Sequence, residues 1–198
     1  MPINGKQEGG KKMGNETLRL ISARRSHRAY ESTPISEEQL KAVLQAAVES
    51  PSAVNRQPWH FTVVRNQGLL DEMNQAVWEQ MMKRGPEKRS PRFADSSFHV
   101  FYHAPTVIFI SGMPDNPYTP IDGGIAVENI ALAAESLGLG SVILGMPRDA
   151  FAGEKADAFR QALHFPEGWD FVIAIALGVP ADTKDAHAVK PDRISFVD

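Results

Sequence analysis

Two short stretches carry most of the chemistry that this chain offers. Residues 24–28 (RRSHR) place three guanidiniums and a hydroxyl within five positions, and residues 50–59 (SPSAVNRQPW) form a loop of short polar side chains that leads into a strand. Guanidinium forks and hydroxyl donors suit a phosphate, whereas Asn and Gln amides suit the edges of a flat heterocycle. Together the two stretches predict a site for a phosphorylated aromatic cofactor.

The bulk composition is that of an ordinary globular protein. The chain has 198 residues, of which 42% are hydrophobic and 23% charged, with a formal net charge of −3. This length allows one domain with a real core, and the weak acidity argues against a dedicated nucleic-acid binder. The absence of cysteine excludes disulfides, thiolate nucleophiles and Cys-ligated zinc or iron–sulfur centres.

The first residues of the chain do not have the pattern of a signal peptide. Residues 1–8 lack the apolar core of a signal peptide, and no apolar run approaches the length of a membrane span, so we expect a cytoplasmic protein without a membrane partner. Residues 1–14, rich in Gly and Lys, are expected to be a flexible arm, and residues 15–198 a single domain.

Capping signals mark several helices. Asn15 is suited to cap a short helix that ends at the arginines, and Ser36 with Gln39 predicts a capping box for the next helix, which Ser50-Pro51 ends. Asp122 is expected to cap a long helix that is apolar on nearly every side, so a partner subunit is the cover we expect for its outer face. The two other helices are predicted over 69–84 and 154–164.

Runs of β-branched and aromatic residues predict four strands, over 59–64, 105–111, 141–144 and 171–178. Residues 193–197 have the character of an extended edge segment. The charged stretch 85–97 is interpreted as a surface loop or, alternatively, as a lid over the site.

Other sites are disfavoured by the sequence. His99 and His103 have a spacing that binds metal on a helix, but no third ligand is evident, so we predict no metal site. Residues 138–143 (GLGSVI) lack the third glycine of a dinucleotide fingerprint and follow a helix instead of a strand. Two plainer interpretations remain open: the arginines 24–28 as a solvated helix end, and Asn55 with Gln57 as turn residues.

Five segments in order resemble the FMN-dependent nitroreductase family. They are RRSHRAY, SPSAVNRQPWHFTVV, the alanine-rich GGIAVENIALAAESLGLG, SVILGMP, and FVIAIALGVP followed by a basic tail with Lys190 and Arg193. The resemblance runs from about Asn15 to Val197. It implies an α+β flavoprotein with a central, mostly antiparallel sheet flanked by helices, and a homodimer with two FMN sites at its interface and an exchanged C-terminal tail.

The resemblance also implies roles for named residues. Arg24 and Ser26 would hold the FMN phosphate and ribityl chain, with main-chain contacts from Arg25, while Arg28 would reach the pyrimidine end of the ring and stabilise the reduced flavin. The remaining implied cofactor-binding residues are Pro51, Ser52, Asn55 and Gln57 from the second subunit, Leu144 and Gly145 against the ring near N5, and Lys190 and Arg193 on the phosphate.

One region departs from the larger family members. Those proteins carry an Asn and a Lys aimed at the pyrimidine edge of the ring, and residues 71–100 here give no clear match to them. The helical excursion that shapes their substrate pocket is also short in this chain. Substrate choice is therefore the property that the resemblance constrains least.

The implied activity is transfer of electrons from NAD(P)H through FMN to electron-poor acceptors such as nitroaromatics or quinones by a ping-pong mechanism, because no dedicated nicotinamide site is present. Three alternatives stay open: another flavin reaction of the family, such as dehalogenation or flavin breakdown; a flavin-binding module without turnover; and a phosphate-ligand binder that takes no flavin.

Overall fold

A four-stranded antiparallel sheet forms the centre of the computed structural model, which describes residues 14–188 and 190–197. The strands are β1 (Trp59–Val64), β2 (Thr106–Gly112), β3 (Gly140–Leu144) and β4 (Asp170–Gly178), in the order β1-β2-β4-β3. All four predicted strands therefore occur, each within one residue of its predicted bounds. The predicted α+β class with a central antiparallel sheet is confirmed.

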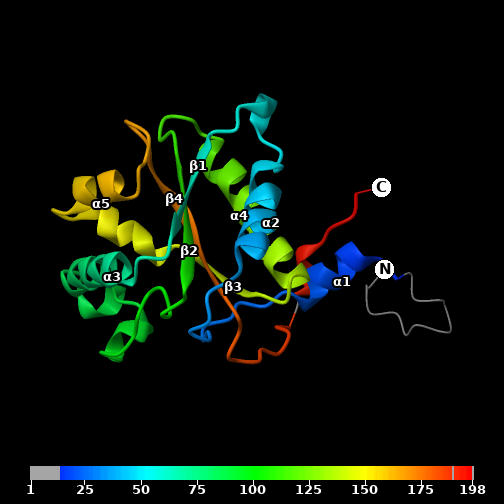
Figure 1. Ribbon diagram of the computed structural model, residues 1–198, viewed down its shortest axis with the longest axis horizontal. Helices are drawn as coiled ribbons and strands as arrows, with labels where there is room; N and C mark the ends of the chain where they lie inside the picture. The colour runs from blue at the N-terminus through cyan, green and yellow to red at the C-terminus, as the bar shows by residue number, and fades with distance from the viewer. Residues whose placement is uncertain (1–13, 189, 198) are drawn as a thin grey trace.

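Helices cover both faces of this sheet (Figure 1). α2 (Glu37–Val48) and α4 (Thr119–Ser136) lie on one face, and α3 (Gln67–Met82) and α5 (Ala156–Ala162) lie on the other. α1 (Glu16–Ala23) contacts α4 and lies near both ends of the described chain. The sheet is thus a middle layer between two helical layers.

Each face of the sheet has its own hydrophobic core. Val107 and Phe109 of β2 belong to the core under α3, whereas Ile108 and Ile110 belong to the core under α2 and α4. All four are fully buried, since successive side chains of a strand point to opposite faces. This explains why β2 is apolar at every inner position instead of alternating with polar residues.

The local capping signals are largely correct. The Asn15 side chain accepts a hydrogen bond from the Leu18 N–H, and Ser36 and Gln39 form the complete capping box, with both hydrogen bonds 3.1 Å long. Gly138 follows the last residues of α4 with a left-handed φ of 71°, the conformation that glycine adopts most readily after a helix.

The predicted cap of α4 is wrong. The helix begins at Thr119 with Tyr118 at the N-cap position, so Asp122 lies inside the first turn. Pro120 suits the start of a helix because its missing N–H is not needed there. Asp122 serves the neighbouring loop instead, since its Oδ1 accepts a hydrogen bond from the Ala53 N–H at 3.2 Å.

Several segments differ in extent from the prediction. α3 begins two residues earlier and ends two residues earlier than expected, with Asn66 as its cap, and α5 is shorter than 154–164. Stretch 85–97 contains two short 3₁₀ turns, and Phe93 within it is buried. The predicted arm, residues 1–14, falls outside the described residues except for Gly14.

The C-terminal segment forms one 3₁₀ turn, Pro191–Arg193, and its following residues join no strand of the described chain. Phe196 is exposed over 70% of its surface. The predicted exchange of this tail with a partner stays a prediction.

Candidate cofactor site

The arginine stretch lies against the edge of the sheet. α1 ends at Ala23, and the chain then runs beside β3, where Ser26 pairs with Ser141 and the His27 N–H donates to the Ser141 carbonyl at 2.9 Å. Since β3 is an edge strand, this pairing gives the stretch a fixed main-chain position. The sheet therefore holds the predicted phosphate-binding residues in place.

The three arginines differ in their freedom to bind a ligand. Arg25 donates through Nη1 to the carbonyls of Ser22 and Arg24 at 2.7 and 2.8 Å, although its buried Nε has no partner among the described residues. Arg24 makes one long ion pair, Nε to Glu128 Oε1 at 3.6 Å. Arg28 makes a weak 3.4 Å bond to the Ser26 carbonyl, and its buried Nε has no partner among the described residues. Arg24 and Arg28 thus keep N–H donors for an anion or a ring carbonyl.

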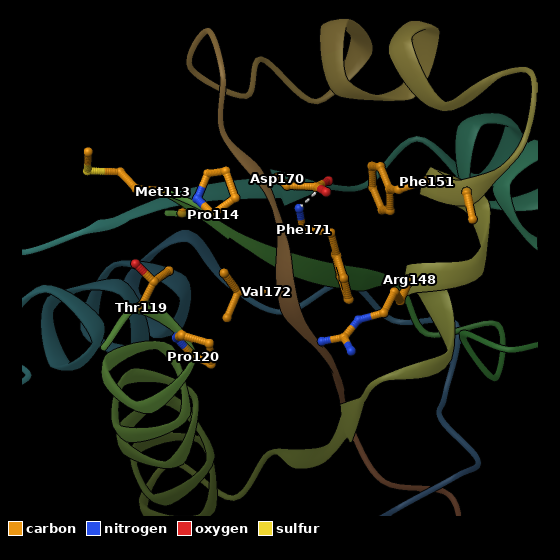
Figure 2. A pocket seen from close by; sticks show the side chains of 11 residues that line it. Met113, Pro114, Thr119, Pro120, Arg148, Phe151, Asp170, Phe171 and Val172 are labelled. Carbon is orange, nitrogen blue, oxygen red and sulfur yellow. Dashed lines mark hydrogen bonds between the residues drawn. The ribbon is translucent and has the colours of Figure 1, made fainter. Parts of the chain in front are cut away.

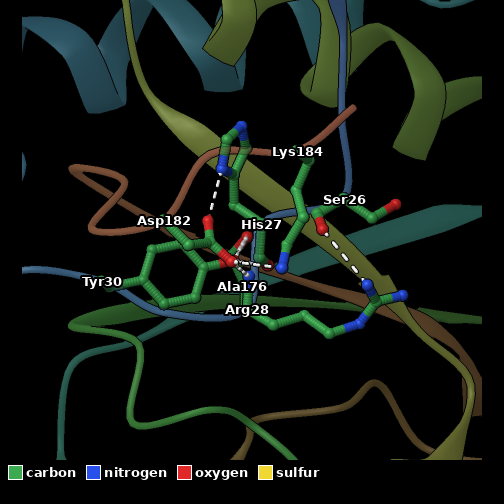
Figure 3. A network of polar contacts seen from close by, with 7 residues as sticks. All are labelled: Ser26, His27, Arg28, Tyr30, Ala176, Asp182 and Lys184. Carbon is green, nitrogen blue, oxygen red and sulfur yellow. Dashed lines mark hydrogen bonds and ion pairs between the residues drawn. The ribbon is translucent and has the colours of Figure 1, made fainter. Parts of the chain in front are cut away.

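Asp182 fixes this stretch from the other side (Figure 3). Its carboxylate contacts the His27 ring at 2.7 Å and the Lys184 ammonium at 3.1 Å, and accepts the Arg28 N–H at 3.1 Å. The Tyr30 hydroxyl adds a bond to the His27 carbonyl at 2.8 Å. Figure 3 also shows the Arg28 guanidinium extending away from this network, so the network positions the main chain and leaves that cation available.

Burial and hydrogen bonding act in opposite directions on Asp182. Burial alone would raise the pKa of this carboxyl, but the hydrogen bonds from His27, the Arg28 N–H and Lys184 outweigh it and hold the pKa below its usual value. Asp182 is therefore charged at neutral pH and ties residues 27–28 to the segment after β4.

The predicted polar loop precedes β1. Its 3₁₀ turn, Ala53–Asn55, has left-handed φ angles of 47° at Val54 and 54° at Asn55. The Ser52 hydroxyl accepts the Gln57 N–H at 2.9 Å, and the Gln57 amide donates to Asn55 Oδ1 at 3.1 Å. Val54 is 84% exposed. Pro51 and this loop thus present a preformed but uncovered surface.

The arginine stretch and the polar loop lie at opposite edges of the sheet. The loop leads into β1 and the arginines lie along β3, with two strands between them, which corresponds to about 14 Å. They also contact different parts of α4, Asp122 near its start and Glu128 in its middle. A single chain does not gather the predicted site residues into one cluster.

The turn after β3 is the third predicted contact region. Leu144 is buried and Gly145 exposed, so the main chain at Gly145 is what this turn offers to a ligand. The Gly145 carbonyl accepts the Arg148 N–H at 3.2 Å. Lys190 and Arg193 are exposed, and no hydrogen bond or ion pair joins either one to the arginine stretch within the described residues.

A cavity of about 340 Å³ opens next to this turn (Figure 2). It lies where β2 ends, β4 begins and α4 starts. Its walls are mostly apolar, and they include Pro114, Phe151 and Phe171 together with the cation of Arg148. No sequence pattern predicted this cavity, because its walls come from four separate segments.

The histidine pair has a neighbour that the sequence did not reveal. His99 Nε2 lies 3.1 Å from Asp71 Oδ1, and the ligand atoms of Asp71, His99 and His103 lie within 4.8 Å of one another. His99 Nδ1 accepts a hydrogen bond from the Phe101 N–H at 3.2 Å. The ring proton is therefore on Nε2, which donates a hydrogen bond to Asp71 Oδ1. A metal bound to Nε2 would require the ring proton on Nδ1. That proton would then face the Phe101 N–H, which is also a donor, and this disfavours metal binding.

Burial disfavours the charged form of His99, and repulsion from His103 adds to this effect, so the pKa of His99 lies below its usual value despite the Asp71 carboxylate. The uncharged His99 ring thus donates a hydrogen bond to the Asp71 carboxylate, and this bond joins α3 to the segment before β2.

The structure is an antiparallel sheet between two helical layers, with the arginine stretch fixed along its edge strand β3. The comparisons give its family. The nitroreductase family model matches residues 21–179, so the chain belongs to the nitroreductase family. An Archaeoglobus fulgidus relative, provisionally named as an NADH dehydrogenase/NAD(P)H nitroreductase, is 36% identical over 190 residues, which cover 90% of this chain and 96% of the relative.

Solved structures agree with this assignment. An FMN-bound nitroreductase from Desulfitobacterium hafniense is 35% identical with a TM-score of 0.89, covering 94% of this chain and 100% of that one. An FMN-bound nitroreductase from Bacteroides fragilis is 31% identical with a TM-score of 0.85, covering 93% and 100%. Separately, no described helix combines the length and apolar character needed to cross a bilayer.

Proposed function

We propose that this chain is an FMN-dependent oxidoreductase that takes electrons from NAD(P)H and passes them to electron-poor acceptors such as nitroaromatics or quinones. Family membership and the FMN-bound relatives support this proposal. The observation that carries it is the arginine stretch fixed along β3, where Arg24 and Arg28 keep N–H donors that no partner among the described residues uses.

The residues present fit FMN. Arg24 and Ser26 would hold its phosphate and ribityl chain, because guanidinium and hydroxyl groups donate strongly to phosphate oxygens. Arg28, with its unpartnered buried Nε, would face the pyrimidine end, and the Gly145 main chain would lie near N5. Lys190 and Arg193, which are exposed in one chain, would close on the phosphate.

The second half of each site would come from a partner subunit. The polar loop with Pro51, Ser52, Asn55 and Gln57 lies at the edge of the sheet opposite the arginines, so a twofold dimer would bring the loop of one subunit to the arginines of the other. Exposed apolar residues on α4 and in the tail offer surface for such a dimer: Ile121, Ile125, Ile194 and Phe196.

The protein groups bind and tune the cofactor, whose bound ring supplies hydride acceptance and donation. A cation at Arg28 would stabilise the negative charge that reduction places near N1 and the C2 carbonyl. No dinucleotide fingerprint occurs in the sequence, so donor and acceptor would occupy the same open face in turn. Ping-pong kinetics is the expected consequence.

Two measurements test this function. The purified protein is expected to be yellow and to release FMN on denaturation, and anaerobic NADPH or NADH is expected to bleach its visible band rapidly. Binding of FMN without bleaching would contradict the enzymatic role, and a colourless monomer that ignores added FMN would contradict the whole proposal. Initial-rate lines should be parallel; intersecting lines would exclude the ping-pong mechanism.

A further inference from the structure

Arg148 lies at the mouth of an apolar cavity and has no ionic partner among the described residues. It is exposed, and no hydrogen bond or ion pair of its side chain occurs among the described residues. Figure 2 shows its guanidinium directed across the opening toward β4 and α4. An arginine side chain without a hydrogen-bond partner keeps its N–H donors for a bound anion.

Two acidic groups near Arg148, one in sequence and one in the cavity wall, already have cationic partners. Asp149, next to it in sequence, pairs with Arg84 at 2.5 Å. Asp170 lines the same cavity, but its Oδ1 accepts hydrogen bonds from Arg160 at 3.1 and 3.2 Å and from the Phe171 N–H at 2.8 Å. Arg148 therefore gives the cavity a net positive character.

The remaining walls suit a flat ring. Phe151 and Phe171 stack with their ring centroids 5.2 Å apart and an angle of 15° between the planes. Pro114 and Pro120 add rigid apolar surface. The hydroxyl of Thr119, on the same wall, has no hydrogen-bond partner among the described residues. The volume of about 340 Å³ lies in the range of small-ligand pockets, about 300–1,000 Å³.

One turn of main chain separates Arg148, in the cavity wall, from Gly145, the predicted flavin contact. The Arg148 N–H donates to the Gly145 carbonyl at 3.2 Å, and the 3₁₀ segment Met146–Ala152 carries both Arg148 and Phe151. A ligand held by Arg148 would therefore lie about one turn of main chain from Gly145. This step rests on the proposed function, which places the flavin N5 there.

We propose that this cavity is the acceptor subsite and that Arg148 selects aromatic acceptors carrying a carboxylate. A carboxylate would bind the guanidinium in the two-bond fork geometry that arginine favours, and the ring would lie against Phe151 and the prolines. The phosphates of the nicotinamide donor are a second source of anionic groups, and the experiment separates the two.

The test compares 4-nitrobenzoate with neutral 4-nitrobenzamide on the FMN-loaded enzyme. In Arg148→Gln, the ratio of kcat/KM for the benzoate to that for the benzamide is expected to fall about three- to tenfold, which is the size of a charged hydrogen bond at an exposed position. Arg148→Glu should lower it further. Arg65→Gln, an exposed arginine paired with Glu37 at the far end of β1, should leave the ratio unchanged.

An unchanged ratio in Arg148→Gln would overturn the proposal. So would a selective rise in the KM of NADPH, which would assign Arg148 to the donor. Binding of benzoate, which no flavin reduces, gives a second readout by calorimetry on the oxidised protein. Benzoate affinity that depends on Arg148 supports the cavity even if turnover fails, whereas an absence of benzoate binding alongside normal turnover refutes the cavity and leaves the proposed function intact.

Discussion

Arg24 and Asp182 would have different roles in the proposed site, one in binding the ligand and one in positioning the main chain. Arg24 has one long ion pair and free donors, which suits direct contact with a phosphate. Asp182 contacts His27, the Arg28 N–H and Lys184, which suits fixing the main chain. One residue would act on the ligand and the other on the shape of its site.

Arg24→Ala should weaken FMN binding about ten- to a hundredfold, because a hydrogen bond to a charged group contributes about 1.5–3 kcal/mol. Quenching of FMN fluorescence by the apoprotein measures the dissociation constant. Arg19→Ala is the control, since Arg19 is exposed on α1 and paired with Glu16. Equal losses in both variants would argue against a phosphate contact at Arg24.

Asp182→Asn should weaken FMN binding by a smaller factor, about three- to tenfold, because the arginine stretch loses its charged anchor while Arg24 and Arg28 remain. Asp185→Asn, three residues further along and exposed, should have no effect. The stability difference between wild type and Asp182→Asn should be full at neutral pH and shrink as the pH falls below about 4, since the folded pKa of Asp182 is depressed. A difference that grows on acidification would refute this role.

His99 predicts a loss of stability on acidification as well, but from burial of its ring instead of from hydrogen bonds to a charged group. Because its pKa is lowered in the fold, the unfolded chain takes up the proton first, and stability should decline as the pH falls below about 6.5. His99→Gln should be less stable at pH 8 but lose less stability on going to pH 5, as measured by urea unfolding. His187→Gln, an exposed control, should keep the full decline, and a full decline in His99→Gln would contradict the assignment.

At the scale of elements, α4 connects the two halves of the proposed site. Its first turn holds the polar loop through Asp122, and its middle holds Arg24 through Glu128. It also packs closely on β4, where the register shift between β2 and β4 lies. A Cβ on Gly123 would meet Val172 Cγ1 at 2.7 Å, so this glycine sets how near α4 approaches the sheet.

Gly123→Ala should therefore destabilise the protein by about 1–3 kcal/mol, because the core has no room for the added methyl group. Adding Val172→Ala should recover part of the loss, a coupling that the double-mutant cycle measures in urea. Strictly additive effects of the two substitutions would show that the close approach is not the cause.

At the scale of the whole molecule, the two edges of the sheet carry the two halves of the proposed site. The arginines lie on β3 and the polar loop precedes β1. Ile121 on α4 is 58% exposed, and Ile125 on the same helix is 37% exposed. A dimer would cover such residues and complete both sites together.

Ile121→Glu should shift the protein toward monomers and weaken FMN binding in parallel, since a charge in an apolar interface is not compensated. Sedimentation velocity and FMN titration measure the two effects. Met82→Glu, a substitution of an exposed residue at the end of α3 on the other face of the sheet, is the matched control. FMN affinity that survives in a proven monomer would refute the shared site.

Local signals in the sequence determined the elements and the chemistry of the ligand. These signals are the caps at Asn15 and Ser36, the runs of β-branched residues and the arginine stretch. Each depends on residues within a few positions, so it can be recognised without a structure. The Asp122 cap failed because Pro120 allowed the helix to start earlier and the carboxylate found a partner in another loop.

Only the tertiary structure decided which distant residues meet. Asp182 contacts His27 across 155 positions, and Asp71 contacts His99 across 28. The cavity at Arg148 is likewise built from the ends of two strands, a helix start and a turn. Such contacts follow from sheet order and strand register, which arise from packing of the whole chain and leave no periodic mark on the sequence.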